Sequence, residues 1–375
     1  MKRATYAQVG VDIDIEAAAA KILYEASKKT WENRKDLLGE VVVPFDDFAG
    51  LRFVRIDKLP AGTVMFGGSD GVATKAELAE RAGKFDTLAF DLMAMVCDDA
   101  VIRGGEPALL KSVLDVNTLG KDSSRLPIIK QLAKGYVAAA KVAGVAIING
   151  ELAQLNDRMG DLKNFHLEWS ADVTWFAHES RLITGYDVSP GDSIVALEEK
   201  GLRCNGISLV RKILKDRYGE WENETLGKTK LIEQALLPSK IYSPVLLDIT
   251  GGYRLAKKPL ARLHAAAHIS GGGIPEKLGR ILRASGFGAS LDNLFKPCDL
   301  MHHCQELGNV TDEEAYRTWN MGNGMLLITP DPQAVIAVAK ENKVNAKVVG
   351  TIDKKPGIRI VSRGYHKPGT ELLFK

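Results

Sequence analysis

The sequence predicts two α/β domains, and three observations support this. Its 375 residues are enough for two domains of ordinary size, and 45% of them are hydrophobic, as in a globular protein. Strand-like runs and helical segments alternate along both halves. The turn-rich segment 186–192 predicts a boundary between an N-terminal domain, residues 1–187, and a C-terminal α+β domain, residues 188–375.

The individual elements follow from hydrophobic periodicity and from the Gly and Pro residues that interrupt it. In the N-terminal half, we expect helices over residues 15–34, with a cap at Asp14, over residues 126–143, and from Leu88 to Gly104. The strands expected in this half cover residues 40–43, 51–56, 63–66, 111–119, 145–148 and 171–178. In the C-terminal half, the expected elements are a strand over 193–197, a helix that starts within 204–212, helices over 275–282 and 332–342, and strands near 348 and 358.

The helix from Leu88 carries three acids among apolar residues. Asp91 and Asp98 are seven residues apart, which puts them on nearly the same face and about 10 Å apart along the axis. Because a buried carboxylate needs a positive partner, we expect a cation there. The spacing is too long for one Mg²⁺ and suits metal ions along a polyphosphate. The alternative is that Asp98 and Asp99 face solvent near the helix end.

A glycine-rich segment before this helix adds two candidates. Asp70 is expected in a tight turn after the strand 63–66, where its carboxylate would be a metal ligand. Lys75 follows five residues later and would reach a phosphate. On this interpretation, Asp91→Asn removes a metal ligand, abolishes turnover and leaves the fold intact.

Three further stretches have site character. The buried strand 145–148 is expected to deliver Glu151 at its C-terminal end, where the alternative is a solvated loop carboxylate. Asn205 and Ser208 stand at a helix start and suit either capping or ligand binding. The glycines after His268 would let the backbone approach an anion, with Pro275 in the first turn of the following helix, although glycine also serves ordinary turns.

Composition excludes several classes of protein. The net charge of +3 arises from 50 basic and 47 acidic residues that are interspersed, which argues against a nucleic-acid partner. The sequence has no apolar run of membrane-spanning length and no apolar segment at the start, so we expect a cytoplasmic protein without a membrane partner. Four irregularly spaced cysteines fit a reducing compartment. The cluster Cys298, His302, His303 and Cys304 does not match zinc spacing and predicts a helix end or interface.

Six motifs occur in an order that resembles one enzyme family. They are GVDID at 10–14, GSDGVATK at 68–75, DLMAM at 91–95 with Asp98 and GEP at 105–107, NGISLVRK at 205–212, HISGGG at 268–273, and YRT at 316–318 with Gly322, Gly324 and Met325. This order, over essentially the whole chain, is similar to that of aminoimidazole ribonucleotide synthetase, also called phosphoribosylformylglycinamidine cyclo-ligase.

The resemblance implies a two-domain α/β fold, a homodimer joined into a barrel by N-terminal β-strands, and a groove for ATP and Mg²⁺. It implies ATP-dependent phosphorylation of the amide oxygen of formylglycinamidine ribonucleotide, followed by ring closure to aminoimidazole ribonucleotide. The expected site residues are Asp70, Lys75, Asn205 and His268 for catalysis; Gly71, Thr74, Asp91, Gly271, Gly272 and Gly273 for nucleotide binding; and Asp70, Asp91, Asp98 and Glu151 for metal. His264 and His268 are candidates for the proton lost on ring closure.

The chain departs from the family pattern near the expected substrate site. Residues 149–156 read NGELAQLN where the family usually has GGETAEMP, residues 203–206 read RCNG instead of HSNG, and Ala73 replaces a glycine. Segments 115–125, 157–164 and 250–258 are longer or altered. Two alternatives therefore remain: another ATP-dependent ligase or small-molecule kinase on the same scaffold, or a non-catalytic nucleotide-binding paralogue. Selenophosphate synthetase and hydrogenase maturation factors would carry an N-terminal or a C-terminal cysteine that this sequence lacks, and thiamine-phosphate kinase would lack the GVDID and YRT motifs.

Overall fold

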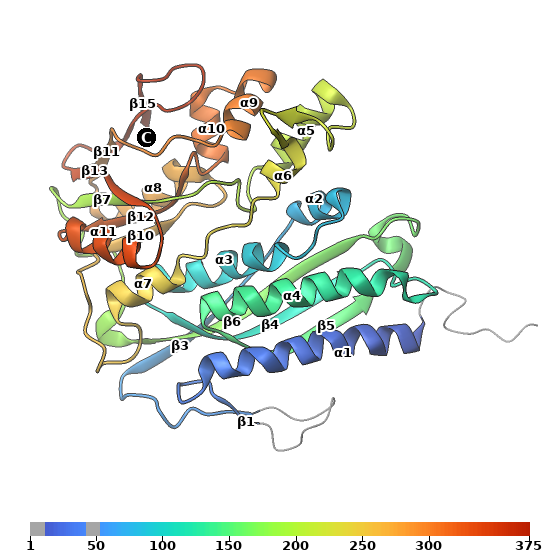
Figure 1. Cartoon of the computed structure of the whole chain (residues 1–375). Helices are drawn as coiled ribbons and strands as arrows, with labels where there is room; N and C mark the ends of the chain where they lie inside the picture. The colour runs from blue at the N-terminus through green and yellow to red at the C-terminus, as the bar shows by residue number, and fades with distance from the viewer. Residues whose placement is uncertain (1–11, 43–52) are drawn as a thin grey trace, which may run out of the picture. The chain divides into compact units, whose positions relative to one another are not determined.

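The computed structural model describes residues 12–42 and 53–375, which form two compact units (Figure 1). The first unit comprises Met1–Ala100 and Pro107–Phe176, and the second comprises Val101–Glu106 and Ala177–Lys375. Each contains a β-sheet with helices, so both halves are α/β. The chain therefore changes units at residue 176, and the short segment 101–106 also belongs to the second unit. The boundary after residue 187 stays a sequence-based prediction.

The first unit is built on a four-stranded sheet in the order β3-β6-β4-β5. These strands are β3 (Thr63–Gly71), β6 (Leu167–His178), β4 (Glu106–Val116) and β5 (Ala146–Gln154). Strand β4 runs parallel to β5, and α4 (Leu126–Ala143) connects them, as the sequence predicts for residues 126–143. Along β4, Ser112 and Leu114 are buried while Lys111 and Val113 are exposed. One face of the sheet is therefore covered by helices.

Three long helices lie along that covered face in Figure 1: α1 (Ile13–Thr30), α3 (Leu88–Val101) and α4. The cap of α1 is Asp12, not Asp14 as predicted, because the Asp12 carboxylate accepts bonds from the backbone N–H groups of Asp14 and Ile15. A 3₁₀ turn, η2 (Trp31–Arg34), follows α1. The short helix α2 (Lys75–Ala82) precedes α3, and β1 (Val41–Val42) pairs with β2 (Phe53–Val54) in a separate ladder. Residues 10, 11, 43, 51 and 52 of the predicted motif and strands lie outside the described residues.

Two strand predictions were too short. The glycine-rich residues 67–71 continue β3 instead of forming a turn, and the chain turns only at Ala73, whose φ is +46°. A Cβ on Gly71 would lie 3.0 Å from the Trp169 carbonyl oxygen, so glycine permits a close approach to β6 at this point. Strand β5 likewise continues to Gln154, beyond the predicted end at residue 148.

The second unit contains a seven-stranded sheet in the order β10-β12-β7-β13-β11-β14-β15. The strands are β10 (Ala265–His268), β12 (Asn323–Thr329), β7 (Ser193–Glu198), β13 (Ala346–Asp353), β11 (Gly288–Leu291), β14 (Gly357–Val361) and β15 (Glu371–Phe374). Only the β11–β14 pair is parallel among the pairs of this sheet that the structure describes. Strand β12 is buried along its whole length, which makes it the centre of the second core.

Helices and a small hairpin complete the second unit. They are α5 (Ile207–Tyr218), β8 (Thr225–Leu226), β9 (Thr229–Lys230), α6 (Leu231–Ala235), α7 (Ser243–Thr250), α8 (Gly273–Ser285), α9 (Asp299–Gly308), α10 (Asp312–Thr318) and α11 (Pro332–Glu341). Val195 and Leu327 of the sheet pack with Ile249 of α7 and Val338 of α11 in one buried cluster. The predicted strand 193–197 and the helix 332–342 are confirmed within a residue.

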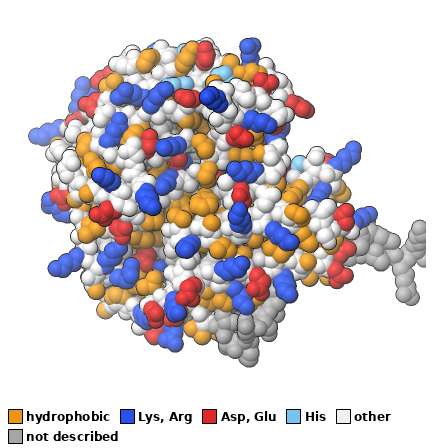
Figure 2. Space-filling view, in the orientation of Figure 1, with side chains coloured by type: hydrophobic (Ala, Val, Ile, Leu, Met, Phe, Trp, Pro, Cys, Tyr) orange, Lys and Arg blue, Asp and Glu red, His pale blue; other side chains and the backbone are white. Residues whose placement is uncertain are grey.

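The surface agrees with the balanced composition. Figure 2 shows basic and acidic side chains interspersed over the face that it draws. In the described part of the chain, no helix is both long and apolar enough to cross a membrane.

Gly135 of α4 gives a direct test of this packing. A Cβ there would lie 2.2 Å from the Asp86 carbonyl oxygen, so we expect Gly135→Ala to lower the free energy of unfolding by about 1–3 kcal/mol, although alanine favours a helix by about 1 kcal/mol. The matched control is Gly279→Ala in α8, where the nearest atom would be 3.9 Å away and a small gain is expected. Urea unfolding of both variants measures this, and equal effects would contradict it.

Candidate active-site residues

The acidic helix α3 is anchored by a buried ion pair. Lys75 begins α2, and its Nζ donates a 2.7 Å hydrogen bond to Oδ1 of Asp91 in the first turn of α3. Neither side chain is exposed. The positive partner expected for Asp91 is therefore, in this structure, a lysine of the same unit. The contacts predicted for Lys75 with phosphate and for Asp91 with metal remain proposals.

The other acids differ in exposure. Asp98 is fully buried two turns after Asp91, whereas Asp99 is exposed. Asp70 is half-buried at the end of β3, where its carboxylate accepts a bond from the Gly71 N–H. Glu151 is exposed on β5. Within residues 12–42 and 53–375, no group of three or more His, Cys, Asp or Glu side chains is arranged to hold a metal ion. These carboxylates therefore do not form a protein-only metal cage, and the chemistry open to them is the usual Mg²⁺ arrangement of one or two carboxylates with substrate phosphates.

Strand β5 also explains one departure from the family pattern. The Gln154 amide donates to Glu16 of α1 at 2.7 Å, and its oxygen accepts from the Leu119 N–H at 2.8 Å. Gln154 thus connects α1 to the segment that follows β4. The replacement of an acid at this position gives the chain a structural bridge that uses both ends of the amide.

Arg203 is the centre of a buried network in the second unit. Its guanidinium pairs with the Glu199 carboxylate at 2.9 Å, donates to the Lys240 carbonyl at 2.9 Å and lies over the Tyr242 ring at 5.3 Å. It also lies 2.8 Å from Nε2 of His268. Because arginine has only donors, this histidine nitrogen must accept, which places the ring proton on Nδ1. Nε2 of His268 is therefore occupied by the Arg203 contact and is poorly placed to take a proton from a substrate.

His264, the other candidate for the proton, is placed differently. Its Nδ1 lies 2.8 Å from a carboxylate oxygen of Asp192, and about a fifth of its side chain is exposed. A carboxylate that contacts one nitrogen of a histidine fixes the orientation of the ring. The geometry therefore favours His264 over His268 as a group that could accept a proton.

Two helix starts meet around Asn205. Helix α5 begins after Gly206, and α8 begins after Gly272; both glycines are left-handed, and neither helix has a side-chain cap among the described residues. The capping role considered for Asn205 is therefore not observed. A Cβ on Gly271 would lie 3.3 Å from the Asn205 amide nitrogen, so the glycine loop approaches Asn205 closely. The buried Asn205 Oδ1 has no hydrogen-bond partner in the part of the chain that the structure describes.

The YRT motif packs against these helix starts. A Cβ on Gly273 would lie 1.9 Å from the Tyr316 carbonyl oxygen, and one on Gly206 would lie 2.3 Å from the Trp319 ring. Both positions therefore require glycine. Two helix N-termini without side-chain caps among the described residues form an environment that suits an anion, and phosphate is the commonest such ligand.

The cysteine and histidine cluster has a structural role, as the sequence predicts. Cys298 is the cap residue of α9 and Cys304 is buried within that helix. His302 bonds the Arg363 carbonyl, whereas His303 bonds the Tyr218 hydroxyl. Burial raises the pKa of both thiols, to about 11 for Cys298 and about 12 for Cys304, so both stay protonated.

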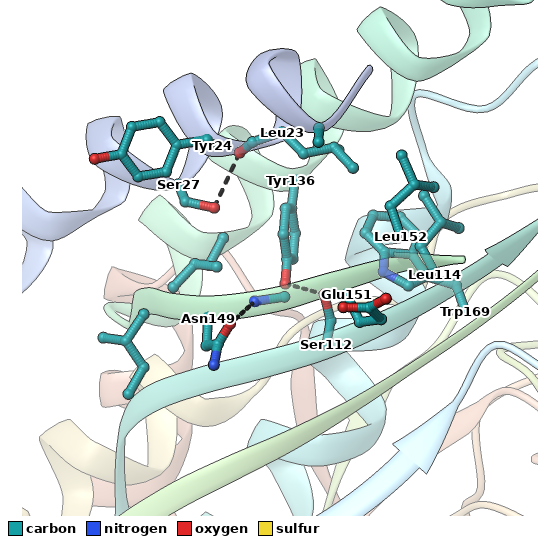
Figure 3. Close-up of a pocket in the computed structure, with 14 residues that line it drawn as sticks. Leu23, Tyr24, Ser27, Ser112, Leu114, Tyr136, Asn149, Glu151, Leu152 and Trp169 are labelled. Atoms are coloured by element: carbon teal, nitrogen blue, oxygen red, sulfur yellow. Dashed lines mark hydrogen bonds between the residues drawn. The ribbon is translucent and has the colours of Figure 1, made fainter. Parts of the chain in front are cut away.

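Sequence reasoning missed a cavity in the first unit. A hollow of about 280 Å³ lies between α1 and the strands β4 and β5, with Ser112, Tyr136 and Trp169 among its lining residues (Figure 3). The signal in the sequence is weak. Ser112 is a polar residue at a helix-facing position of β4, and nothing nearby in the sequence marks its partners.

The comparisons with known proteins establish the family. The AIR synthase related family matches the chain with its N-terminal domain at residues 46–167 and with its C-terminal domain at residues 189–363. The phosphoribosylformylglycinamidine cyclo-ligase of Thermococcus kodakarensis is 32% identical over 362 residues, which cover 96% of this chain and 98% of the relative. The chain therefore belongs to the AIR synthase related family.

Solved structures agree on the fold. The E. coli hydrogenase maturation protein HypE matches with a TM-score of 0.61 at 14% identity, over 96% of each chain. A thiamine-monophosphate kinase from Stenotrophomonas maltophilia matches with a TM-score of 0.59 at 15% identity, over 92% of this chain and 97% of the other. At these identities the likeness concerns the two-domain α/β fold alone.

The buried ion pair predicts a large effect on stability. We expect Asp91→Asn to lower the free energy of unfolding by about 3–5 kcal/mol, because it removes a carboxylate that is paired with the buried Lys75 ammonium. Asp91→Asn should therefore destabilise the fold, whereas the sequence alone predicted that it would leave the fold intact. The double variant Lys75→Met with Asp91→Leu is the control and should recover most of the loss. Unfolding by urea measures both; an Asp91→Asn variant as stable as the wild type would contradict the assignment.

The contacts of His166 predict that the stability of the fold depends on pH. One of its two partners, Asp161, belongs to the altered segment 157–164. Its Nδ1 lies 2.8 Å from Glu80 and its Nε2 lies 3.2 Å from Asp161. Partial burial lowers the pKa of His166, but the hydrogen bonds with Glu80 and Asp161 outweigh it and raise the pKa above the ordinary 6.5. The protonated ring therefore stabilises the fold below pH 6.5, and this contribution is lost as pH rises through the raised pKa. An NMR titration of His166 should give a midpoint above 6.5, and Glu80→Gln should lower this midpoint. A wild-type midpoint at or below 6.5 would contradict the stabilising contacts of His166 with Glu80 and Asp161.

Proposed function

We propose that this protein is a phosphoribosylformylglycinamidine cyclo-ligase that acts in purine biosynthesis. The observation that carries the proposal is the 32% identity with a relative of that name over 96% of this chain and 98% of the relative. A match over both domains includes both the acidic helix and the glycine loop. A second relative with the same name, from Methanocaldococcus jannaschii, is 33% identical over 93% of this chain.

The proposed reaction has two steps. ATP transfers its γ-phosphoryl group to the formyl amide oxygen of formylglycinamidine ribonucleotide, and ADP leaves. An amidine nitrogen then attacks the activated carbon, the C–O bond breaks, and the former amide oxygen leaves within phosphate. Most of the catalytic requirement is therefore to position the groups and to neutralise the phosphates.

In the first unit, we assign ATP binding to Asp70, Gly71, Thr74, Asp98 and Glu151. The nucleotide phosphates would lie near the end of β3 and the start of α2, where Gly71 packs closely against the Trp169 carbonyl of β6. Mg²⁺, when bound, would neutralise those phosphates with one or two of the carboxylates. The buried pair of Lys75 and Asp91 would hold α2 against α3 and so fix the distance between these groups.

In the second unit, we assign substrate binding to Asn205 and the glycines at 271, 272 and 273. The two uncapped helix starts suit the 5′-phosphate of the ribonucleotide, because their N–H groups carry partial positive charge. The unpaired Asn205 Oδ1 suits an N–H or hydroxyl donor of the substrate. His268, held by Arg203, would be a donor or a positioning residue, and His264 would be the stronger candidate for the proton.

We also propose a homodimer formed through the first unit. Strand β3 is at an edge of the sheet formed by the described residues and exposes Val64, Met65 and Phe66 in succession. The uncovered face of the sheet also exposes Val113. An edge with this composition is prone to pair with another chain. A second copy would cover both surfaces, as the intersubunit barrel implied by the family resemblance would.

The test is to follow ADP and aminoimidazole ribonucleotide together, with and without formylglycinamidine ribonucleotide. We expect equal amounts of both products, formed only when substrate is present. Asn205→Ala should raise the substrate KM about tenfold, the effect of losing one buried hydrogen bond. Asn345→Ala, at an exposed asparagine, is the matched control.

Two results would contradict the proposal. ADP release that does not depend on this substrate would favour another ATP-dependent enzyme on the same scaffold. Nucleotide binding without any turnover would favour a non-catalytic paralogue.

A further inference from the structure

The cavity beneath α1 is unused by the proposed roles. Its side-chain walls come from α1, α4 and the strands β4, β5 and β6, all in the first unit: Leu23, Tyr24, Tyr136, Leu114, Leu152 and Trp169. Figure 3 shows these side chains around one space, with Asn149 beside it. The exposed Gly150 also lines the cavity. The acids of α3 do not line it. A cavity of about 280 Å³ is nearly twice the ~150 Å³ that accommodates benzene in an engineered protein core.

Trp169 brings an unpaired donor to this cavity. The residue is only 2% exposed, and its Nε1 has no hydrogen-bond partner among the described residues. A buried donor without an acceptor is destabilising, so such groups in folded proteins usually have a partner. A ligand with a hydrogen-bond acceptor would supply one.

Ser112 offers a second donor nearby. The Tyr136 hydroxyl donates a 2.7 Å bond to the Ser112 oxygen, and burial raises the pKa of Tyr136, so the tyrosine keeps its proton. The Ser112 proton is therefore directed to another acceptor. The Tyr136 and Trp169 rings meet edge to face, with centroids 5.0 Å apart. The Trp169 N–H and the Ser112 hydroxyl, which contacts Tyr136, therefore lie beside one pair of aromatic rings.

The walls contain no positive charge. Neither Lys, Arg nor His is among the residues that line the cavity, so a phosphate or a carboxylate would be buried there without a counter-ion. Glu151 is the single charged residue of the lining. It pairs with the exposed Val113 across the ladder, while the cavity residue Leu114 pairs with Leu152, so strand alternation turns the Glu151 side chain towards the opposite face.

Gly150 keeps the floor of the cavity open. It pairs with Ser112 across the ladder, and a Cβ at this position would lie 3.7 Å from the Ser112 oxygen, on the cavity side. Its backbone φ is not positive, so another residue can adopt the same conformation. A larger side chain at position 150 would therefore fill the cavity without backbone strain.

We propose that this cavity binds the uncharged, bicyclic heteroaromatic ring of a purine, whose ring nitrogens accept hydrogen bonds from Trp169 and Ser112. The apolar and aromatic walls match a planar ring, and the volume admits two fused rings but not a whole nucleotide. Such a ring has two sources. It is either the base of the ATP that the proposed function requires, in which case the inference rests on that function, or a free purine nucleoside that binds independently.

The test uses adenosine, which carries no phosphate and needs no metal, in calorimetric titrations of the whole protein. We expect Trp169→Phe, which keeps the aromatic wall and removes the N–H, to weaken binding about tenfold. We expect Gly150→Leu to abolish binding because it fills the cavity. Trp221→Phe, at a buried tryptophan of the second unit, is the matched control and should bind like the wild type. Thermal unfolding of each variant confirms that it is folded.

A competition experiment distinguishes the two sources, and both of its outcomes keep the cavity as the binding site. ATP that displaces adenosine identifies the base of ATP, whereas simultaneous binding identifies a separate nucleoside site. If the wild type does not bind adenosine, or if Trp169→Phe and Gly150→Leu bind it as the wild type does, the proposal is overturned. Because no turnover is measured, this failure is distinct from failure of the cyclo-ligase assay.

Discussion

The arrangement of the first unit depends on one buried ion pair. Lys75 and Asp91 are both inaccessible to water, and each would be costly to bury alone. Their contact joins the first residue of α2 to the first turn of α3, so the Gly71 end of β3, α2 and the acidic helix are held as one block. Breaking the pair would therefore alter the placement of Asp70 and Asp98 even if neither contacts it. The carboxylate of Asp91, which the sequence predicts as a metal ligand, thus holds α2 against α3 in this structure.

The second unit reaches its geometry through close packing at two glycines. Gly206 and Gly273 have no room for side chains, because Trp319 and the Tyr316 carbonyl occupy those positions. The close packing brings the starts of α5 and α8 together at Asn205, with their N–H groups uncapped by side chains. Arg203, at a position where the family resemblance implies histidine, contacts Glu199, Tyr242 and His268 within its own unit. Although Arg203 lies next to the proposed phosphate site in sequence, its charge is paired with Glu199, and its role in this structure is to hold neighbouring residues in place.

Hydrophobic periodicity predicted the fold class and long elements such as α4, whose bounds agree with the predicted 126–143. It failed at Gly67 and Gly150, because glycine reads as a turn in sequence while tertiary pairing can hold it in a strand. The acid spacing on α3 identified Asp91 as a residue that needs a cation. It did not find Lys75 as that cation, because the contact depends on how α2 packs on α3. The cavity partners Ser112, Tyr136 and Trp169 come from three elements, and only the folded chain brings them together.

The central claim is that ATP activates the formyl amide oxygen, which then leaves within phosphate. Formylglycinamidine ribonucleotide labelled with ¹⁸O at this oxygen tests it directly. After turnover with unlabelled ATP in unlabelled water, the account predicts that mass spectrometry finds one ¹⁸O in each phosphate released. Label in the water, or phosphate that contains no ¹⁸O, would contradict the mechanism even if the ring product formed.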